Sequence, residues 1–377
     1  MFTSTSTKKI TIRIILYFLL ALCFVASVFF VGHNESLYER PIAEVTKTVL
    51  EDTTPVSDMY SNDDQLFTQR ITAVLKNGEA KGQLIYLTNE YSSSAAFDHE
   101  YKVGNKLFIS IKADTKNTGQ LTGTIIDVKR DFYVLMVAWI FIFTLLIVGK
   151  RKGLFSIISL IVNALILSFA LDLYVKHSNV NLLIVSGVCV LLFTGVSLIL
   201  INGLNEKTYA AMLATILGTF ISLLISFFVM WITSEKGLRY EEMQFLTRPY
   251  HMVFMAGLFI GALGAVMDVS ITMASSMFAL YDQDPTISAK ALKTSGLDIG
   301  KDIMGTITSI LFFVYICGSI PMLILYLKNS STLGLTLSMN LSLELARALA
   351  GGIGVVLTIP ISLYTSMIFI KRKRVNR

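Results

Sequence analysis

Long apolar runs constrain this chain more than any other feature of its sequence. Only 15% of its 377 residues are charged, against roughly 25% in soluble domains, and 54% are hydrophobic. This composition excludes an ordinary cytosolic enzyme and predicts an all-α polytopic membrane protein with about eight transmembrane helices. The runs that are long enough to span a bilayer cover residues 10–31, 132–149, 154–175, 181–203, 209–233, 252–281, 303–327 and 341–370.

The positive charges indicate the orientation of these helices. An even number of spans puts both termini on one side, and cytoplasmic segments are enriched in lysine and arginine. With the N-terminus inside, the cytoplasmic segments carry fifteen basic residues and the short outer loops carry five. We therefore expect both termini in the cytoplasm, residues 32–131 on the other side of a cell membrane, and the lipid bilayer as partner of the apolar helices. The basic residues assigned to the cytoplasm are Lys8, Lys9, Arg13, Lys150, Arg151, Lys152, Lys207, Lys290, Lys293, Lys301, Lys371, Arg372, Lys373, Arg374 and Arg377.

A polar segment separates the first apolar run from the second. Residues 32–131 contain five stretches of strand-like alternation, at 41–49, 67–76, 83–90, 103–112 and 121–128, with hairpin signals at Asn77-Gly78 and in residues 116–119. They predict a small extracytoplasmic all-β domain, an OB-like barrel inserted after the first helix. Its fifteen acidic and eleven basic residues exclude a nucleic-acid groove, which requires the opposite sign. The expected domains are a signal-anchor helix at 1–31, the β domain at 32–131, and a seven-helix membrane domain with a cytoplasmic tail at 132–377.

The sixth apolar run carries the most informative residues. Asp268 lies seventeen residues after His251 and thirteen before Tyr281, near the middle of the bilayer, where a lone charge costs about 3 kcal/mol on insertion scales. It belongs to a helix face of small and polar residues at steps of three or four: Gly257, Gly261, Gly264, Asp268, Thr272 and Ser275. One interpretation is a cation or proton site on a route lined by the other five residues. The other is a packing face, on which Asp268 is protonated or hydrogen-bonded.

The last apolar run contains a second face of this kind. Its members are Asn340, Glu344, Arg347, Gly351, Gly354 and Thr358. Glu344 and Arg347 can form an ion pair at i, i+3, although Arg347 could instead reach Asp268 or an anionic substrate. Gly351, Gly352 and Pro360 make this run a candidate for a discontinuous helix, as in many transporters.

Further charged residues flank the sixth and seventh runs. Asp284, Pro285 and Gly296 predict a short interfacial helix on the cytoplasmic side, and Pro321 is expected to kink the seventh run. Asp302, Thr306 and Ser309 form a candidate cytoplasmic gate, although Asp302 could simply complement a helix dipole. A candidate outer vestibule, whose members could equally anchor the helix at lipid headgroups, consists of Arg239, Glu241, Glu242, Arg248 and His251.

The sequence lacks the motifs of common catalytic and cofactor-binding sites. Residues 296–302, GLDIGKD, have three residues rather than four between the glycines and no hydroxyl after Lys301, so they are not a phosphate-binding loop. The four histidines are scattered, no HExxH or GxSxG motif occurs, and the three cysteines lack metal-ligand spacing. We therefore predict no enzyme activity, no catalytic residue, no metal site and no cofactor.

Several short motifs in the membrane region resemble those of one family. They are Glu241-Glu242-Met243, Thr247-Arg248-Pro249, GALGAVMDV at 261–269, Ala274-Ser275-Ser276 and GKDIMGT at 300–306. Together they are similar to the YibE/YibF-like family of bacterial multipass membrane proteins, over about residues 132–370. The resemblance implies a permease-like protein of the bacterial cell membrane, of the longer YibE-like type, which could work beside a shorter YibF-like relative. It supplies no substrate and no catalytic residue.

Two classes of function fit these observations. The leading hypothesis is a permease that moves a small solute or ion along the sixth run, with Asp268 as its cation or proton site. The alternative is a non-catalytic membrane scaffold or assembly partner, packed against a YibF-like protein or a second copy in a homo-oligomer. In a third arrangement, an ATPase subunit docks near Lys290 and Lys293, because the chain itself has no nucleotide site.

Overall fold

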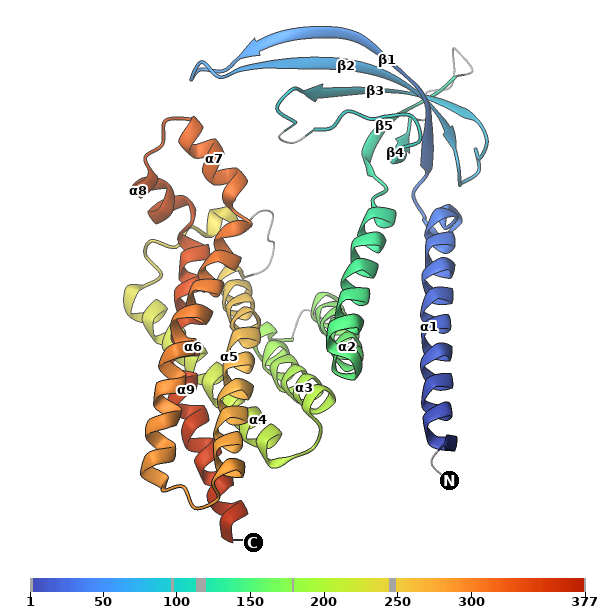
Figure 1. Ribbon diagram of the computed structural model, residues 1–377. Helices are drawn as coiled ribbons and strands as arrows, with labels where there is room; N and C mark the ends of the chain where they lie inside the picture. Colours follow the sequence, from blue (N-terminus) through green and yellow to red (C-terminus); the bar gives the residue numbers. More distant parts are fainter. Residues whose placement is uncertain (1–2, 96–97, 113–119, 178–179, 244–248, 376–377) are drawn as a thin grey trace. The chain divides into compact units, whose positions relative to one another are not determined.

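The computed structural model describes residues 3–95, 98–112, 120–177, 180–243 and 249–375, with side chains from Phe18 onward except those of Glu242 and Asn340. Figure 1 shows the helices and strands along the chain. The chain divides into two compact units, Met1–Thr144 and Leu145–Arg377, and each contains buried apolar clusters of its own. The two units are therefore described separately.

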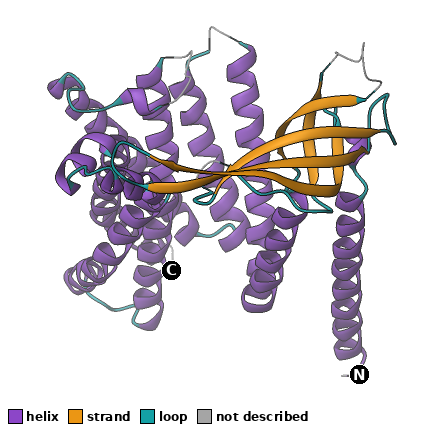
Figure 2. Cartoon of the chain, turned by 90° about the horizontal axis from the view of Figure 1, so that it is seen from above, coloured by secondary structure: helices purple, strands orange, loops and turns teal. Residues whose placement is uncertain are grey.

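The first unit contains five strands between two helices. It begins with α1 (Thr3–Gly32) and the 3-10 turn η1 (Glu35–Leu37), and it ends with the first part of α2 (Asp131–Lys176). The strands are β1 (Ile42–Ser57), β2 (Asp63–Leu75), β3 (Leu84–Ser92), β4 (Lys106–Ile111) and β5 (Leu121–Val128). The predicted five-stranded domain is confirmed, but β1 and β2 extend further and form a long hairpin (Figure 2). The sequence did not mark this extension, because the second half of β1 is almost entirely exposed and shows no alternation of burial.

The strands pair in the order β1-β2-β3-β5-β4, and β4 also pairs with the beginning of β1. β3 and β5 are parallel, and the other neighbours are antiparallel. Asn77-Gly78 lies in the predicted connection between β2 and β3, with Gly78 at φ +80°, whereas the second hairpin signal at 116–119 lies outside the described residues. The inward-facing side chains form one apolar core: Ala43, Val45, Ile71, Ala73, Leu75, Ile85, Leu87, Tyr101, Leu107 and Ile109.

The second unit is helical. The remainder of α2 is followed by α3 (Leu182–Asn202), α4 (Glu206–Thr233), the 3-10 turn η2 (Tyr240–Glu242), α5 (Tyr250–Gln283), α6 (Ala289–Cys317), α7 (Ile320–Lys328), α8 (Leu333–Leu335), the π turn η3 (Thr336–Asn340) and α9 (Ser342–Val375). Among the described residues, six helices are long and apolar enough to cross a membrane: α2, α3, α4, α5, α6 and α9. α2 contains two of the predicted runs, and the non-helical backbone of Lys150, at φ 48° and ψ −120°, divides it into two helical segments.

Small residues let α4 and α9 pack closely in the second unit. Gly218 of α4 faces the side chain of Thr358 on α9, and Gly354 of α9 faces Ser222 on α4. The hydroxyl of Ser222 donates to the carbonyl of Ala350 at 3.0 Å. Glycines let helix backbones approach closely enough for such contacts, as in many membrane helix pairs. Gly354 and Thr358, which belong to the face of small and polar residues predicted on the last apolar run, therefore serve to pack α9 against α4.

The predicted short helix at 284–296 is wrong. Asp284 follows the end of α5, and its carboxylate accepts the backbone N–H of Thr286 at 2.9 Å. Ser288 then caps α6, which continues through Gly296 to Cys317. Gly296 does not stop the helix, because it lies where α6 packs against the side chains of Leu363 and Met277.

The expected irregularities in the last two runs also lie elsewhere. Pro321 stands in the first turn of the separate helix α7, so it does not kink one continuous span. α9 runs unbroken from Ser342 to Val375 with Pro360 inside it, so the prediction of a discontinuous helix is wrong. Gly351 and Gly352 instead make room for Leu311 and Thr308 of α6.

Candidate functional site

The predicted α5 face is one surface of a continuous helix, and it points away from the buried core. α5 has 34 residues, and Asp268 stands eighteen residues after Tyr250 and fifteen before Gln283. Asp268 and the three glycines at 257, 261 and 264 are exposed, and Thr272 and Ser275 are partly buried. The opposite side of α5 carries large apolar residues that are almost completely buried, among them Phe254, Phe259 and Met273. The small and polar residues of α5 therefore occupy its exposed side, and the large apolar residues occupy the side that packs against the core.

Asp268 has no hydrogen bond or ion pair with any of the described residues. Arg347, which could have reached it, pairs instead with Glu344 at 3.0 Å, as the i, i+3 spacing predicted. Both side chains of this pair are 23% exposed, and the guanidinium lies 5.2 Å from the ring centre of Phe254. Arg347 is therefore engaged at the start of α9 and does not neutralise Asp268.

The candidate gate residues Asp302, Thr306 and Ser309 are all exposed on α6. The Ser309 hydroxyl donates to the carbonyl of Gly305 at 2.8 Å, so its hydrogen bond stays within the helix. Asp302 stands thirteen residues after Ala289, the first residue of α6. It therefore cannot complement the N-terminal dipole of that helix, because this effect is confined to the first turn. No hydrogen bond among the described residues connects Asp302 with Asp268.

Three of the five vestibule candidates have side chains that the structure describes: Arg239, Glu241 and His251. The backbone N–H of Arg239 donates to the Ser342 hydroxyl at 3.1 Å, which ties the loop after α4 to the start of α9. Glu241 and His251 are exposed, and neither forms an ion pair with a described residue. Arg248 and the side chain of Glu242 lie outside the described residues.

Aromatic contacts hold this loop against the start of α5. The Tyr240 ring lies 4.7 Å from that of Tyr250 and 5.9 Å from that of Phe254, between ring centres. Phe254 is almost completely buried, and the Arg347 guanidinium lies over the same ring, 5.2 Å from its centre. Packing around the buried ring of Phe254 therefore contributes to the order of the described part of the loop.

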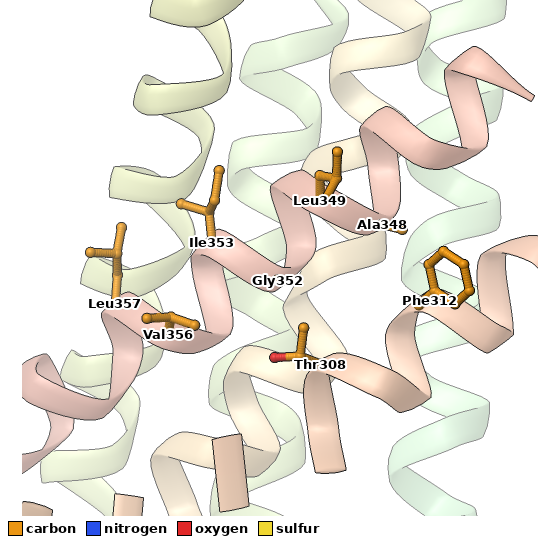
Figure 3. Close-up of a pocket in the computed structure, with 8 residues that line it drawn as sticks. All are labelled: Thr308, Phe312, Ala348, Leu349, Gly352, Ile353, Val356 and Leu357. Atoms are coloured by element: carbon orange, nitrogen blue, oxygen red, sulfur yellow. The ribbon is translucent and has the colours of Figure 1, made fainter. Parts of the chain in front are cut away.

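An apolar groove of about 390 Å³ lies between α6 and α9. Figure 3 shows Thr308 and Phe312 of α6 on one side and the side chains of α9 on the other. The residues along it are Thr308, Phe312, Ala348, Leu349, Gly352, Ile353, Val356 and Leu357. Thr308 is the only polar residue among them, so the groove has the character of a surface that faces lipid chains or another apolar helix.

Sequence reasoning missed a polar junction where the β domain meets α1 and α2. The Lys129 ammonium, on a residue that is 7% exposed, donates to the carbonyl of Val31 at 2.9 Å and pairs with Asp131 at 2.8 Å. Asn34 and the Tyr38 hydroxyl also donate to Asp131, at 3.2 and 3.1 Å. One carboxylate at the start of α2 thus connects the end of α1 with the last strand.

Asn77 joins the same junction from the β2–β3 connection. Its Oδ1 accepts the buried N–H of Ile42 at 2.6 Å. Its Nδ2 group lies 2.9 to 3.0 Å from the carbonyls of Glu35, Tyr38 and Arg40. The Asn-Gly pair, which the sequence marks only as a turn, therefore also fixes the chain between α1 and β1.

Lys106 completes the junction. Its ammonium donates to the carbonyl of Gly32 at 2.9 Å and pairs with the carboxylate of Glu35. Burial alone would raise the pKa of Glu35, but the hydrogen bond and charge of Lys106 outweigh it and hold the pKa below its ordinary value. The charged residues beside the apolar runs, Lys129 and Asp131, are the sequence signal that could have revealed this junction.

The described residues contain no group of three or more His, Cys, Asp or Glu side chains that could hold a metal ion. On the α5 face, one carboxylate and two hydroxyls lie beside exposed glycines. Such a face can bind a cation or a proton, or it can dock against another helix.

Comparison with known families agrees with the motifs in the sequence. A family model described as YibE/F-like protein matches residues 137–372, and a model of the YibE/F family N-terminal domain matches residues 36–128. No curated protein and no solved structure matches the chain. The two family matches cover the helical region and the β domain, and the first alone covers more than half of the sequence. The resemblance inferred from the motifs is thus confirmed, and the protein belongs to the YibE/F-like family.

Proposed function

We propose that this protein is a permease-like membrane protein that moves a small solute or ion along the exposed face of α5, with Asp268 as its cation or proton site. The observation that carries the proposal is the position of Asp268. It is exposed near the middle of a 34-residue apolar helix and has no partner among the described residues. A carboxylate at such a depth requires a proton, a cation or hydrogen-bond donors, and intramembrane carboxylates of this kind commonly mark ion pathways.

The other residues of the face have matching roles in this proposal. The glycines at 257 and 264 leave room beside the helix, Gly261 lies against the Tyr315 hydroxyl of α6, and the hydroxyls of Thr272 and Ser275 supply oxygen ligands on one side of Asp268. Asp302, Thr306 and Ser309 form the cytoplasmic gate on α6. Arg239, Glu241, Glu242, Arg248 and His251 form the outer vestibule.

The proposal includes a topology with eight membrane crossings. The six long apolar helices support it, because the kink at Lys150 divides the 46 residues of α2 into two spanning lengths and α1 adds another. Both termini are cytoplasmic, residues 32–131 are extracytoplasmic, and the membrane is the plasma membrane of a bacterial cell. The fifteen-to-five distribution of basic residues supports this orientation.

We also propose that the extracytoplasmic domain is an OB-like barrel. The strand order β1-β2-β3-β5-β4, with β4 returning to β1 and β3 parallel to β5, supports this assignment. The β1–β4 and β3–β5 ladders contain only three residue pairs each, which agrees with the partly open barrel of that fold.

A second candidate function is a membrane scaffold without enzyme activity or cofactor. Space for a partner favours it, because a Cβ atom added at Gly257 or Gly264 would meet no atom within 4 Å. The partner would be a YibF-like membrane protein, a second copy, or an ATPase subunit that contacts the exposed Lys290 and Lys293 at the start of α6. A scaffold needs the face for packing only, so it does not require the charge of Asp268.

Ion flux through reconstituted protein separates the two functions. Full-length protein is placed in liposomes that contain a pH-sensitive dye, a membrane potential is imposed, and parallel vesicles contain indicators for metal cations. We expect flux through the wild type, and loss of that flux in Asp268→Asn, which keeps the size of the side chain but removes its charge. Asp298→Asn is the control, because it removes a carboxylate that is 63% exposed and paired with Lys301 on α6. Equal flux through Asp268→Asn and the wild type would contradict the proposal, as would rates no higher than in empty liposomes for every ion.

A further inference from the structure

The polar side chains of the α5 face lack the hydrogen bonds that two buried threonines of α3 and α4 make. Asp268, Thr272 and Ser275 make no side-chain hydrogen bond with the described residues. In contrast, Thr194 of α3 and Thr219 of α4 donate to the carbonyls four residues earlier, at 2.7 Å each. The face is therefore incomplete in the second unit taken by itself.

The glycines of the face leave open space beside these groups. An added Cβ at Gly257 or Gly264 would meet nothing within 4 Å, whereas Gly261 is covered by the Tyr315 hydroxyl of α6. Gly257 and Gly264 are seven residues apart, which is two helical turns or about 10 Å. Exposed small residues at such spacing let a second helix approach closely in a membrane.

The donors and acceptors of the face complement themselves under two-fold symmetry. In a parallel pair of identical helices, each residue meets the same residue of the other helix and those one turn away. Thr272 stands four residues after Asp268, about 6 Å along the axis, so its hydroxyl can donate to the Asp268 carboxylate of the other copy. The two carboxylates then lie close enough to share one proton or one cation. Arg347 offers no competing partner, because it is paired with Glu344.

We propose that Gly257, Gly264, Asp268 and Thr272 form the interface with a second copy of this chain, and that the paired Asp268 carboxylates form one shared proton or cation site. The inference rests on the proposed function, since it specifies how the site of that function is built. A two-fold homodimer is also the commonest closed assembly of identical chains.

Subunit counting tests the interface directly. Full-length protein with one fluorophore per chain is reconstituted in lipid nanodiscs at several protein-to-lipid ratios, and bleaching steps are counted. We expect two copies of the wild type and a loss of about tenfold or more in the association constant of Gly264→Leu. Gly305→Leu is the matched control, because Gly305 is exposed on α6 and its added Cβ would also meet nothing within 4 Å. Since an added Cβ has open space at both positions in the single chain, we expect both variants to fold. A monomeric wild type, or a Gly264→Leu variant that pairs as well as the wild type, would overturn the proposal.

Crosslinking in native membranes identifies what covers the face. Thr272→Cys is introduced into a variant without Cys23, Cys189 and Cys317, and the membranes are treated with an oxidant. We expect a disulfide-linked pair of the chain, and no such pair for Leu224→Cys, whose side chain on α4 is 65% exposed. A crosslink to a different protein, or none in Thr272→Cys, would overturn the assignment to a second copy.

The two proposals fail in different ways. If the protein is monomeric and Asp268→Asn still abolishes flux, the shared site is wrong and the permease function stands. If the protein pairs through the face and Asp268→Asn conducts normally, the proposed function fails, and with it the shared site, while the interface stands as a scaffold contact. If Gly264→Leu loses both pairing and flux while Gly305→Leu keeps both, the two proposals are supported together.

Discussion

Replacing Asn77 with alanine should loosen the junction between the β domain and its flanking helices. The buried N–H of Ile42 loses its acceptor, and an unsatisfied buried donor costs about 1 to 3 kcal/mol. The carbonyls of Glu35, Tyr38 and Arg40 share two amide hydrogens and are only partly buried, so their loss adds about 1 kcal/mol. The expected decrease in the free energy of local opening is about 2 to 4 kcal/mol.

Hydrogen exchange of the full-length protein in lipid nanodiscs measures this change. A loss of 2 to 4 kcal/mol corresponds to exchange that is roughly 30-fold to 700-fold faster for the amides around Ile42. Asn105→Ala is the control, because the Asn105 side chain accepts a single hydrogen bond, from the exposed backbone N–H of Lys102. Its removal should change the exchange rate of the amides around Ile42 by less than tenfold, which corresponds to about 1.4 kcal/mol in the free energy of local opening. Unchanged exchange at Ile42 in Asn77→Ala would refute the account of the junction.

Three further predictions concern charge and packing. The pKa of Glu35 lies below its ordinary value, so the stability that its ion pair contributes is present above about pH 4.5 and is lost as the pH falls through the lower pKa of the folded state. The melting temperature of the β domain within the whole protein should therefore fall in acid, and Glu35→Gln should lack this component; an identical acid profile would contradict it. Gly300→Leu should destabilise the helical unit by about 1 to 3 kcal/mol in thermal melts, because its side chain would collide with α9, whereas Gly305→Leu has open space; equal melting temperatures would count against this packing. Arg347→Met should lower the free energy of unfolding of the helical unit by about 1 to 3 kcal/mol, because the partly buried Glu344 carboxylate loses its partner. The double variant that also carries Glu344→Gln should recover most of that stability in thermal melts, and no recovery would contradict an energetic role for the pair.

The elements that follow from hydrophobic periodicity were predictable from the sequence. Five strands were expected because inward-facing residues such as Val45, Ile71 and Leu107 alternate with polar ones. The extension of β1 and β2 was not, since a hairpin exposed on both faces carries no such alternation. The helices α3, α4, α5 and α9 match predicted runs, and α2 contains two more on either side of the kink at Lys150, whereas the seventh run is divided between α6 and α7.

Residues with two possible roles were the least predictable. Gly296 and Gly351 were expected to stop or interrupt helices, yet both lie inside them, because the space of a missing side chain is filled by a neighbouring helix. The shared face of Gly257 and Asp268 on α5 was predictable from spacing, whereas its outward direction was not. Periodicity identifies which residues share a face, and only the packing of the other helices determines what that face meets.

The chemical access of the α5 face tests the central claim most directly. Single cysteines at 257, 264, 272 and 275, in a variant without the three native cysteines, are exposed to membrane-impermeant thiol reagents from each side of sealed vesicles. Position 261 is left out, because a side chain there would collide with Tyr315. We expect cysteines at 257 and 264 to react from one side and those at 272 and 275 from the other, which would place water on both sides of Asp268. Protection of all four cysteines from both sides would mean a dry packing face and would contradict a route past this carboxylate.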